Sequence, residues 1–505
     1  MSSRTVPGVI VDAGGQRLDT AALVSLRVRQ QLSLPTLCEL VFSDPPGPLR
    51  PARELAPGTP LHLTVQGHVD ALFAGEVTAV ELVYGPAMER WVRVRAYDRL
   101  HRLQKRHPVR ALVEMATADL ARELVADLGL GIETEDAGPL WPFLIQHGQS
   151  DWALLVDVAE SSGLFPWVHE STLQLLTLEG RGAPLALALG TGLLEARLEL
   201  NEAPACRSVE ATGWNPLRAE SYAEARSDAA SGRQAAAEVP ASALSGEGRC
   251  VVLDLVAQGE RQVEARAGAE LARRVAHEVT LWGIAEGDPR LNPGARVTLT
   301  GVDEAYEGTY VLAAATHTLD AERGYMTELS TAPPTPQPLG GGAGHAVATL
   351  GVVTRVDDPD QRGRVCVALP TFADVETTWM HVLSAAAGAN KGLVALPDVG
   401  DRVLVLFPRD ALGEGVVLGG LYGMDGPYDS GVEANAVRRY TLRTPGGQHV
   451  VLDDAGDLVR VEDSRGSFVE LAPEKLRVHA EVDLEIEAPG RSVVIRGQAI
   501  DFERG

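Results

Sequence analysis

Residues 440–496 read YTLRTPGGQHVVLDDAGDLVRVEDSRGSFVELAPEKLRVHAEVDLEIEAPGRSVVIR. Short stretches in which apolar and polar residues alternate, the period of a strand, are separated by turn residues such as those at 445–447. Each strand offers one apolar row, and the segment holds nothing that would cover it. The sequence therefore predicts an intertwined trimeric β-helix or prism, with the apolar rows of three copies on one axis. A conventional sandwich is the alternative. Val450 and Leu452, or their neighbours in the other register, would point inward.

The composition is that of a soluble globular chain. Its 505 residues favour about three domains, with 45% hydrophobic and 23% charged residues. The formal net charge is −24, from 45 Lys and Arg against 69 Asp and Glu, so nucleic acid or an anionic membrane surface is not expected as the main partner. Four scattered cysteines fit neither a zinc site nor a disulfide framework and are expected to be free thiols in a reducing compartment: Cys38, Cys206, Cys250 and Cys366.

No targeting or membrane-spanning segment is visible in the sequence. Residues 1–20 lack a basic region followed by an apolar run. No stretch approaches the roughly 18 consecutive apolar residues that a spanning helix needs. We therefore expect no signal peptide, assembly in the cytoplasm and no integral membrane segment.

The first region, residues 1–330, is predicted to be mainly β with a minor helical part. Alternating stretches indicate strands, and an Ala-, Ser-, Glu- and Gly-rich segment at 219–249 is expected to be a mobile loop. Apolar residues at helical spacing indicate three helices, the first N-capped by Thr117 and the second by Ser150: 117–128, 151–162 and 262–279.

The clearest domain boundary is a Pro- and Gly-rich stretch, which suits a linker between independently folded units. Closely spaced short strands follow it and are typical of a small barrel of the oligonucleotide/oligosaccharide-binding (OB) type. The predicted domains are a hub region (1–330), the linker (331–346), an OB-fold barrel (347–423), a connector (424–437) and a trimeric β-prism spike (438–505).

Several motifs, in a fixed order along the chain, carry a resemblance to a known family. They are VRAYDRLHRL at 94–103, IQHGQSDWALL at 145–155, GTYV at 308–311, DPDQRGRV at 358–365 and PDVGDRVLVLF at 397–407. Each motif is weak alone. In this order the chain resembles the hub–spike proteins of contractile injection machines, which include VgrG-like spikes of type VI secretion, the phage late control D family and the spikes of extracellular injection particles.

The resemblance implies an architecture and a mechanical role. It implies a tube-like hub of two related β-barrels with a helical insert, so that three chains present six barrels to a sixfold inner tube. The tail would narrow to a threefold spike that pierces the target envelope. The implied partners are two sister copies, an inner tube protein, baseplate proteins, a PAAR-like tip cap and an effector as cargo, all in a phage-tail-like particle.

The motifs of common catalytic sites are missing or incomplete. The chain has no GxSxG, and His277–Glu278 lacks the second His of a zinc protease. The stretch 423–437 is too short for the lysozyme domain that some phage spikes carry there. Asp157 and Glu160 lie one turn apart on a predicted helix and are interpreted as a solvated face. The sequence therefore predicts no enzyme and no catalytic or cofactor-binding residue.

No metal site is expected either. The acidic turn at 357–363 lacks the ligand spacing of a calcium loop, and His449 and His479 lie far from the chain end, where some spike tips bind iron. His317 is expected to be a core or interface imidazole rather than a metal ligand. Two alternatives stay open: a spike-associated peptidoglycan hydrolase, and an OB-type glycan or single-strand binding protein, which would need aromatic and basic side chains on the barrel. Three tryptophans near the helical part are interpreted as core packing: Trp141, Trp152 and Trp167.

Overall fold

The computed structural model describes residues 8–43, 54–86, 89–215, 218, 220–335, 346–408, 413–423 and 426–501. The chain is 47% strand and 14% helix, which confirms the mainly β fold with a minor helical part. It forms two compact units, Met1–Gly420 and Leu421–Gly505. Among the described residues, no helix is both long and apolar enough to cross a membrane.

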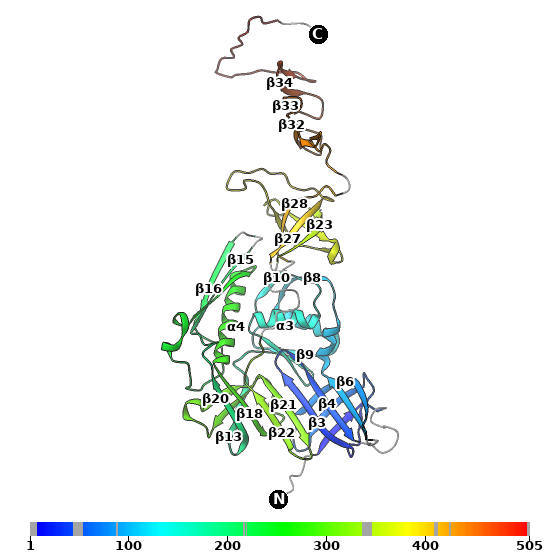
Figure 1. Ribbon diagram of the computed structural model, residues 1–505, viewed down its shortest axis with the longest axis vertical. Coiled ribbons are helices and arrows are strands. Elements are labelled where there is room, and N and C mark those ends of the chain that lie inside the picture. Colours follow the sequence, from blue (N-terminus) through cyan, green and yellow to red (C-terminus); the bar gives the residue numbers. More distant parts are fainter. Residues whose placement is uncertain are drawn as a thin grey trace. The chain divides into compact units, whose positions relative to one another are not determined.

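A single 14-stranded sheet dominates the first unit (Figure 1). Its N-terminal half is antiparallel in the order β2-β1-β5-β6-β7-β4-β3 and buries residues such as Leu40, Phe42 and Val94. The strands are β1 (Val9–Ala13), β2 (Gln16–Arg17), β3 (Leu23–Gln31), β4 (Leu34–Ser43), β5 (Pro60–Val65), β6 (Ala71–Tyr84) and β7 (Arg90–Tyr97).

The second half of this sheet continues edge to edge from the first. β21 pairs antiparallel with β3, with His317 opposite Val28, and the order runs on as β21-β22-β18-β14-β13-β19-β20. This half has its own core, which includes Leu281, Val297 and Tyr310. The resemblance implied two related β-barrels in the hub; in the described residues these strands form one shared sheet with two cores. The strands are β13 (Arg181–Leu189), β14 (Gly192–Leu200), β18 (Val279–Glu286), β19 (Ala295–Thr300), β20 (Gly308–Val311), β21 (Ala314–Asp320) and β22 (Gly324–Ser330).

The helical part packs around a third core. The Ser150 hydroxyl caps α3 by accepting the amide N–H of Ala153 at 3.1 Å, as predicted. Thr117 is not an N-cap, because it is the first residue of α2 itself. Its side chain is buried, and its hydroxyl accepts the indole N–H of Trp141 at 3.4 Å. The elements are η1 (Arg99–Lys105), β8 (Arg110–Ala116), α2 (Thr117–Val125), η2 (Ala126–Leu128), β9 (Gly131–Thr134), β10 (Leu140–Gln146), α3 (Asp151–Ser161), β11 (Phe165–His169) and β12 (Thr172–Leu176).

The prediction of a mobile loop over 219–249 is wrong for residues 220–226, which form a strand paired along its length with β15, whereas residues 227–240 are irregular, as a loop is. The later part of the segment is tied to the buried carboxylate of Glu278. That carboxylate accepts the N–H of Val239 at 2.7 Å and pairs with Arg207 at 3.0 Å. These tethers outweigh the low strand propensity of the segment. The elements are β15 (Ser208–Asn215), β16 (Glu220–Arg226), η3 (Ala241–Ala243), η4 (Ser245–Gly248), β17 (Arg249–Val256) and α4 (Glu260–Glu278).

A small closed barrel follows within the same unit. Strands β23, β27, β28, β26 and β24 form a ring that closes through the pairing of β23 with β24, and β25 adds to β24. Ile145 of β10 joins the barrel core, so the barrel packs on the helical part. The elements are β23 (Val347–Arg355), β24 (Arg364–Leu369), η6 (Pro370–Phe372), β25 (Val375–Glu376), β26 (Met380–Val382), β27 (Arg402–Phe407) and β28 (Val416–Gly420).

The second unit contains a five-stranded antiparallel meander, β31-β32-β33-β34-β35. The strands predicted near 482–487 and 493–496 do not form, because no strand among the described residues pairs with them. Residues 336–345 of the predicted linker lie outside the described residues. The elements are β29 (Val432–Glu433), β30 (Ala436–Val437), β31 (Arg439–Arg443), β32 (His449–Asp453), β33 (Leu458–Glu462), β34 (Phe468–Ala472) and β35 (Lys475–His479).

Candidate functional site: the apolar face of the tail sheet

One face of the tail sheet is apolar from edge to edge. Because side chains alternate along a strand, the cross-strand register decides which of them share a face. Tyr440 lies opposite Leu452, and the same row continues through the next strands; Leu442 begins a second row opposite Val450. We call these ten residues the apolar tail face: Tyr440, Leu442, Val450, Leu452, Val459, Val461, Val469, Leu471, Leu476 and Val478.

No described part of the chain buries this face. Val461, near its centre, is 50% exposed, and Leu476 on β35 is 63% exposed. No described residue from 432 to 501 is buried, and none belongs to a hydrophobic core. Val450 and Leu452, whose register the sequence left open, both belong to the apolar tail face. An uncovered face of this size and uniformity indicates an interaction surface.

The opposite face of the same sheet is charged and internally paired. The Arg460 guanidinium binds Glu462 at 2.7 Å and Glu470 at 2.8 Å, and it lies 3.9 Å from the ring centre of Phe468. The imidazole of His449 approaches Glu462 at 3.4 Å. This pairing satisfies the polar side of the sheet in water, so the sheet has one wet face and one face suited to burial.

The acidic turn of the barrel is a structural clamp. The Asp358 carboxylate accepts the N–H groups of Asp360 and Arg362 and binds the Arg364 guanidinium at 2.6 Å. The Arg364 hydrogen bond holds the pKa of Asp358 well below its usual range. The motif DPDQRGRV therefore fixes the connection from β23 to β24. Among the described residues, no group of three or more His, Cys, Asp or Glu side chains is placed to hold a metal.

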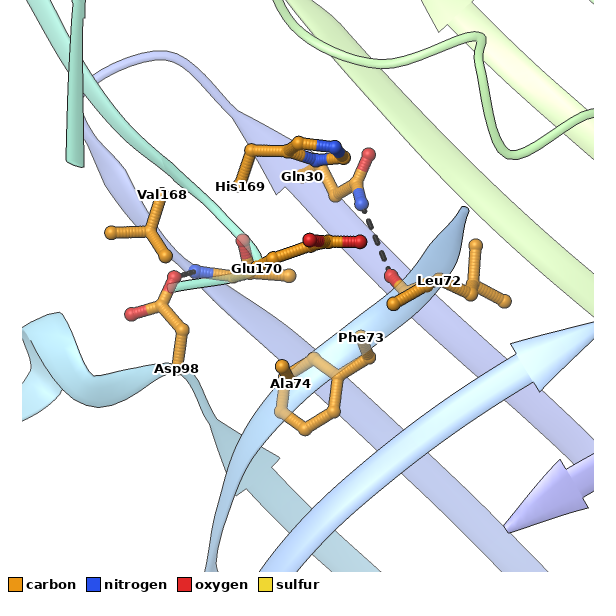
Figure 2. Close-up of a pocket in the computed structure, with 10 residues that line it drawn as sticks. Gln30, Leu72, Phe73, Ala74, Asp98, Val168, His169 and Glu170 are labelled. Carbon is orange, nitrogen blue, oxygen red and sulfur yellow. Dashed lines mark hydrogen bonds between the residues drawn. The ribbon is translucent and has the colours of Figure 1, made fainter. Parts of the chain in front are cut away.

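The Tyr–Asp pair of the first motif also has a structural task. Asp98 caps η1 by accepting the N–H of Leu100 at 2.9 Å, and its other oxygen accepts the N–H of Thr36 on β4 at 2.6 Å. Figure 2 shows it at the edge of a cavity of about 20 Å³, where the Gln30 amide donates to the Leu72 carbonyl at 3.2 Å. Burial raises the pKa of Asp98 to about 7. The cavity has room for about one water molecule.

Of the two carboxylates interpreted as a solvated helix face, Asp157 is exposed and lies beside a cavity of about 200 Å³, whereas Glu160 is half-buried. Asp157 lines this cavity together with Arg266 and Trp141, whereas Glu160 does not. Desolvation raises the pKa of both carboxyls, and arginines facing them act in the opposite direction. Ser161 and Ser162 also line this cavity, but their hydroxyls donate to the Val158 carbonyl at 2.8 and 3.0 Å, and no second carboxylate is among the lining residues. The absence of catalysis stays a prediction.

The remaining candidates behave as packing groups. His317 is fully buried, and its Nδ1 lies 3.1 Å from the hydroxyls of both Tyr325 and Thr327. Burial lowers the pKa of His317 to about 4, so it is a neutral core imidazole, as predicted. Trp152 and Trp167 are buried in the core, also as predicted, and Trp141 is half-buried against it.

The barrel and the hub were compared with known proteins. Residues 349–422 match the family described as the type VI secretion system/phage-baseplate injector OB domain. Residues 8–321 match the family described as the Alg8 N-terminal domain. The search of curated proteins found no match.

Solved structures share the fold at low identity. A Francisella PdpA–VgrG complex contains a chain with 8% identity and a TM-score of 0.54, covering 94% of this chain and 88% of that one. An Escherichia coli component of the type VI secretion system, structurally similar to the T4 tail proteins gp27 and gp5, has 12% identity and a TM-score of 0.51, covering 81% and 99%. A prophage 43 kDa tail protein from Shewanella oneidensis has 12% identity and a TM-score of 0.50, covering 64% and 97%.

The described chain thus has the fold of VgrG-like spike and phage tail proteins, with an injector-type OB barrel, in agreement with the sequence resemblance. Because the match over residues 8–321 spans more than half of the chain, this protein belongs to the family of the Alg8 N-terminal domain.

Proposed function

We propose that this protein is the central hub–spike of a contractile injection machine and that it works as a homotrimer. The observation that carries the proposal is the apolar tail face, ten side chains that no part of the described chain covers. Three copies of a sheet with one apolar face form a closed prism, with those faces inside and the charged, paired faces outside. Such a prism places a hydrophobic axis inside a wet surface.

The proposed task is mechanical. The hub, with two β units in each chain, would present six units from three chains to a sixfold inner tube, and the tail would continue as a threefold spike that pierces the target envelope. The work would come from a contracting sheath, which is another protein. The spike would cross a membrane without being an integral membrane protein, and it would have no enzymatic activity, metal or cofactor.

The proposed partners follow the same reasoning. Besides two sister copies, they are the inner tube protein, baseplate proteins, a PAAR-like cap on the spike tip and an effector as cargo. The Francisella complexes pair a VgrG with PdpA, which is a property of those proteins. The net charge of −24 argues against nucleic acid as a partner. Assembly would take place in the cytoplasm, as part of a tail-like particle.

The experiment is a measurement of native mass at micromolar concentration. The full chain is expected at three times its 53.6 kDa. A chain cut after Tyr422 lacks the apolar tail face and should assemble more weakly. A monomeric full chain, or assembly that does not depend on the tail, would contradict the proposal.

A further inference from the structure

The hub contains a cavity rich in arginine, away from the tail. Its volume is about 220 Å³, many times the ~30 Å³ that one water occupies in the liquid. It lies where the turn before β6 and the end of β11 meet the beginnings of β13 and β19. We call it the arginine pocket, after the side chains that give it its character: Asp70, His169, Arg181, Arg290, Asn292 and Arg296.

The guanidinium of Arg181 is held by two contacts, but its Nε forms no hydrogen bond. Its guanidinium lies 5.3 Å from the ring centre of Trp167, and its Nη2 donates to Oδ1 of Asn292 at 2.8 Å. The amide of Asn292 is oriented by its own bond to the Pro289 carbonyl at 3.1 Å. Nε of Arg181 is buried and has no partner. No carboxylate among the described residues forms an ion pair with Arg181, a costly state for a charge removed from water.

Arg296 repeats this pattern on the neighbouring strand. Its Nε is also buried without a partner, and within the described chain it pairs with no carboxylate. Arg290, at the rim, has a bidentate bond to Asp288, with Nη2 at 2.6 Å. Asp70 is the one carboxylate that lines the pocket, and it forms no ion pair with a described residue. Three arginines thus line the pocket with one carboxylate, while Asp288 pairs with Arg290 and Glu133 acts on Arg181 from beyond ion-pair distance.

His169 completes the lining. Its ring stacks on Trp167 with centroids 5.4 Å apart. Burial first, and then the charge of Arg181, lowers the pKa of His169, so the imidazole is neutral at pH 7 and offers an N–H to a ligand. The pocket thus combines guanidinium forks, which match planar or tetrahedral oxyanions, with a neutral donor.

We propose that the arginine pocket is a binding site for an oxyanion, a phosphate or a carboxylate group. Two sources can supply this chemistry: a free ion such as inorganic phosphate, or an acidic side chain of a second copy of this chain. Either ligand would bind the guanidinium groups of Arg181 and Arg296, which line the pocket.

The test is calorimetric titration of the full chain with inorganic phosphate. Arg296→Gln and Arg181→Lys should each weaken phosphate binding at least tenfold, the latter because an ammonium keeps the charge but lacks the fork. Asp70→Asn should strengthen it, because a repelling charge is removed. Arg197→Gln is the matched control, since Arg197 also lies over a tryptophan, Trp282 at 4.5 Å, but outside the pocket. It should leave binding unchanged.

The two sources give different results. If a free ion is the ligand, phosphate binds the unaltered chain and raises its melting temperature, and Arg296→Gln weakens the binding at least tenfold and reduces the rise in melting temperature. If a side chain of a second copy is the ligand, phosphate does not bind, but Arg296→Gln weakens self-association in a salt-dependent way while Arg197→Gln does not. If phosphate does not bind, and Arg296→Gln leaves self-association as unchanged as Arg197→Gln does, the proposal is overturned. A monomeric chain that binds phosphate would refute the trimer and leave the pocket intact.

Discussion

Two adjacent residues of β32 provide the sharpest test of the tail. Val450 belongs to the apolar tail face, whereas Val451 points to the charged face and lies directly across from Arg460. The substitutions Val450→Asp and Val451→Asp therefore make the same chemical change one residue apart, on opposite sides of the sheet. Only the first would place a carboxylate on the axis of a prism.

The expected difference is large. The neighbours of Val450 across the sheet, Leu442 and Val461, are 54% and 50% exposed. Covering the remaining half of such side chains contributes roughly 1 kcal/mol each, or about 10 kcal/mol per chain for the whole face. Val450→Asp loses its own share and leaves a carboxylate in apolar surroundings, which costs several kcal/mol per ion and about 10 kcal/mol for three copies. Val451→Asp faces Arg460 in water and should change stability by less than about 1 kcal/mol.

The assay is hydrogen exchange of residues 439–479 followed by mass spectrometry, because it reports on the tail even if the hub associates by itself. In the unaltered chain and in Val451→Asp, the tail amides should exchange slowly. In Val450→Asp they should exchange as in an unfolded segment, since one uncovered sheet of five short strands is not stable in water. Equal protection in both variants would refute the reasoning, and so would rapid exchange in the unaltered chain.

Three further predictions concern the first unit. Asp358→Ala should destabilise the barrel by about 3 kcal/mol, because Arg364 loses its buried partner. Since the pKa of Asp358 is lowered in the folded protein, this stabilisation should be present at neutral pH and be lost below about pH 4. Urea denaturation at several pH values would measure both effects. Ser150→Ala should cost about 1 kcal/mol through loss of the α3 cap to Ala153, measured by thermal unfolding. Burial raises the pKa of Glu414 from 4.5 to about 7, so stability should decline as pH rises through this interval, and Glu414→Gln should flatten that part of the profile; an unchanged slope would contradict the assignment.

Much of the fold was predictable because strand alternation and helix capping are local signals. The Ser150 cap and the strands of the tail up to 479 are examples. The segment 220–226 was missed because Ala, Ser and Glu have low strand propensity, and its pairing with β15 is a tertiary fact. Residues 482–500 keep the alternation of strands but pair with no strand among the described residues, and no local rule supplies a partner.

The sequence predicted that the tail would have one apolar face, but it did not predict which residues of each strand lie on that face. Val450, Val451 and Leu452 are three apolar residues in succession, so either face of β32 was open to burial. The choice is made by neighbours on other strands, where Arg460 and Glu470 stand on one side and Val459 and Val461 on the other. The arginine pocket was out of reach of sequence patterns, because its side chains come from separate elements that only the folded hub brings together.

The tail meander has a consequence for how its length can change. Each strand pairs only with its predecessor and its successor, and the two apolar rows run straight across every strand. One additional hairpin would extend the sheet by about 10 Å while leaving every existing pair intact. Duplication or deletion of a single hairpin would therefore lengthen or shorten the tail sheet without changing the packing of the strands that remain.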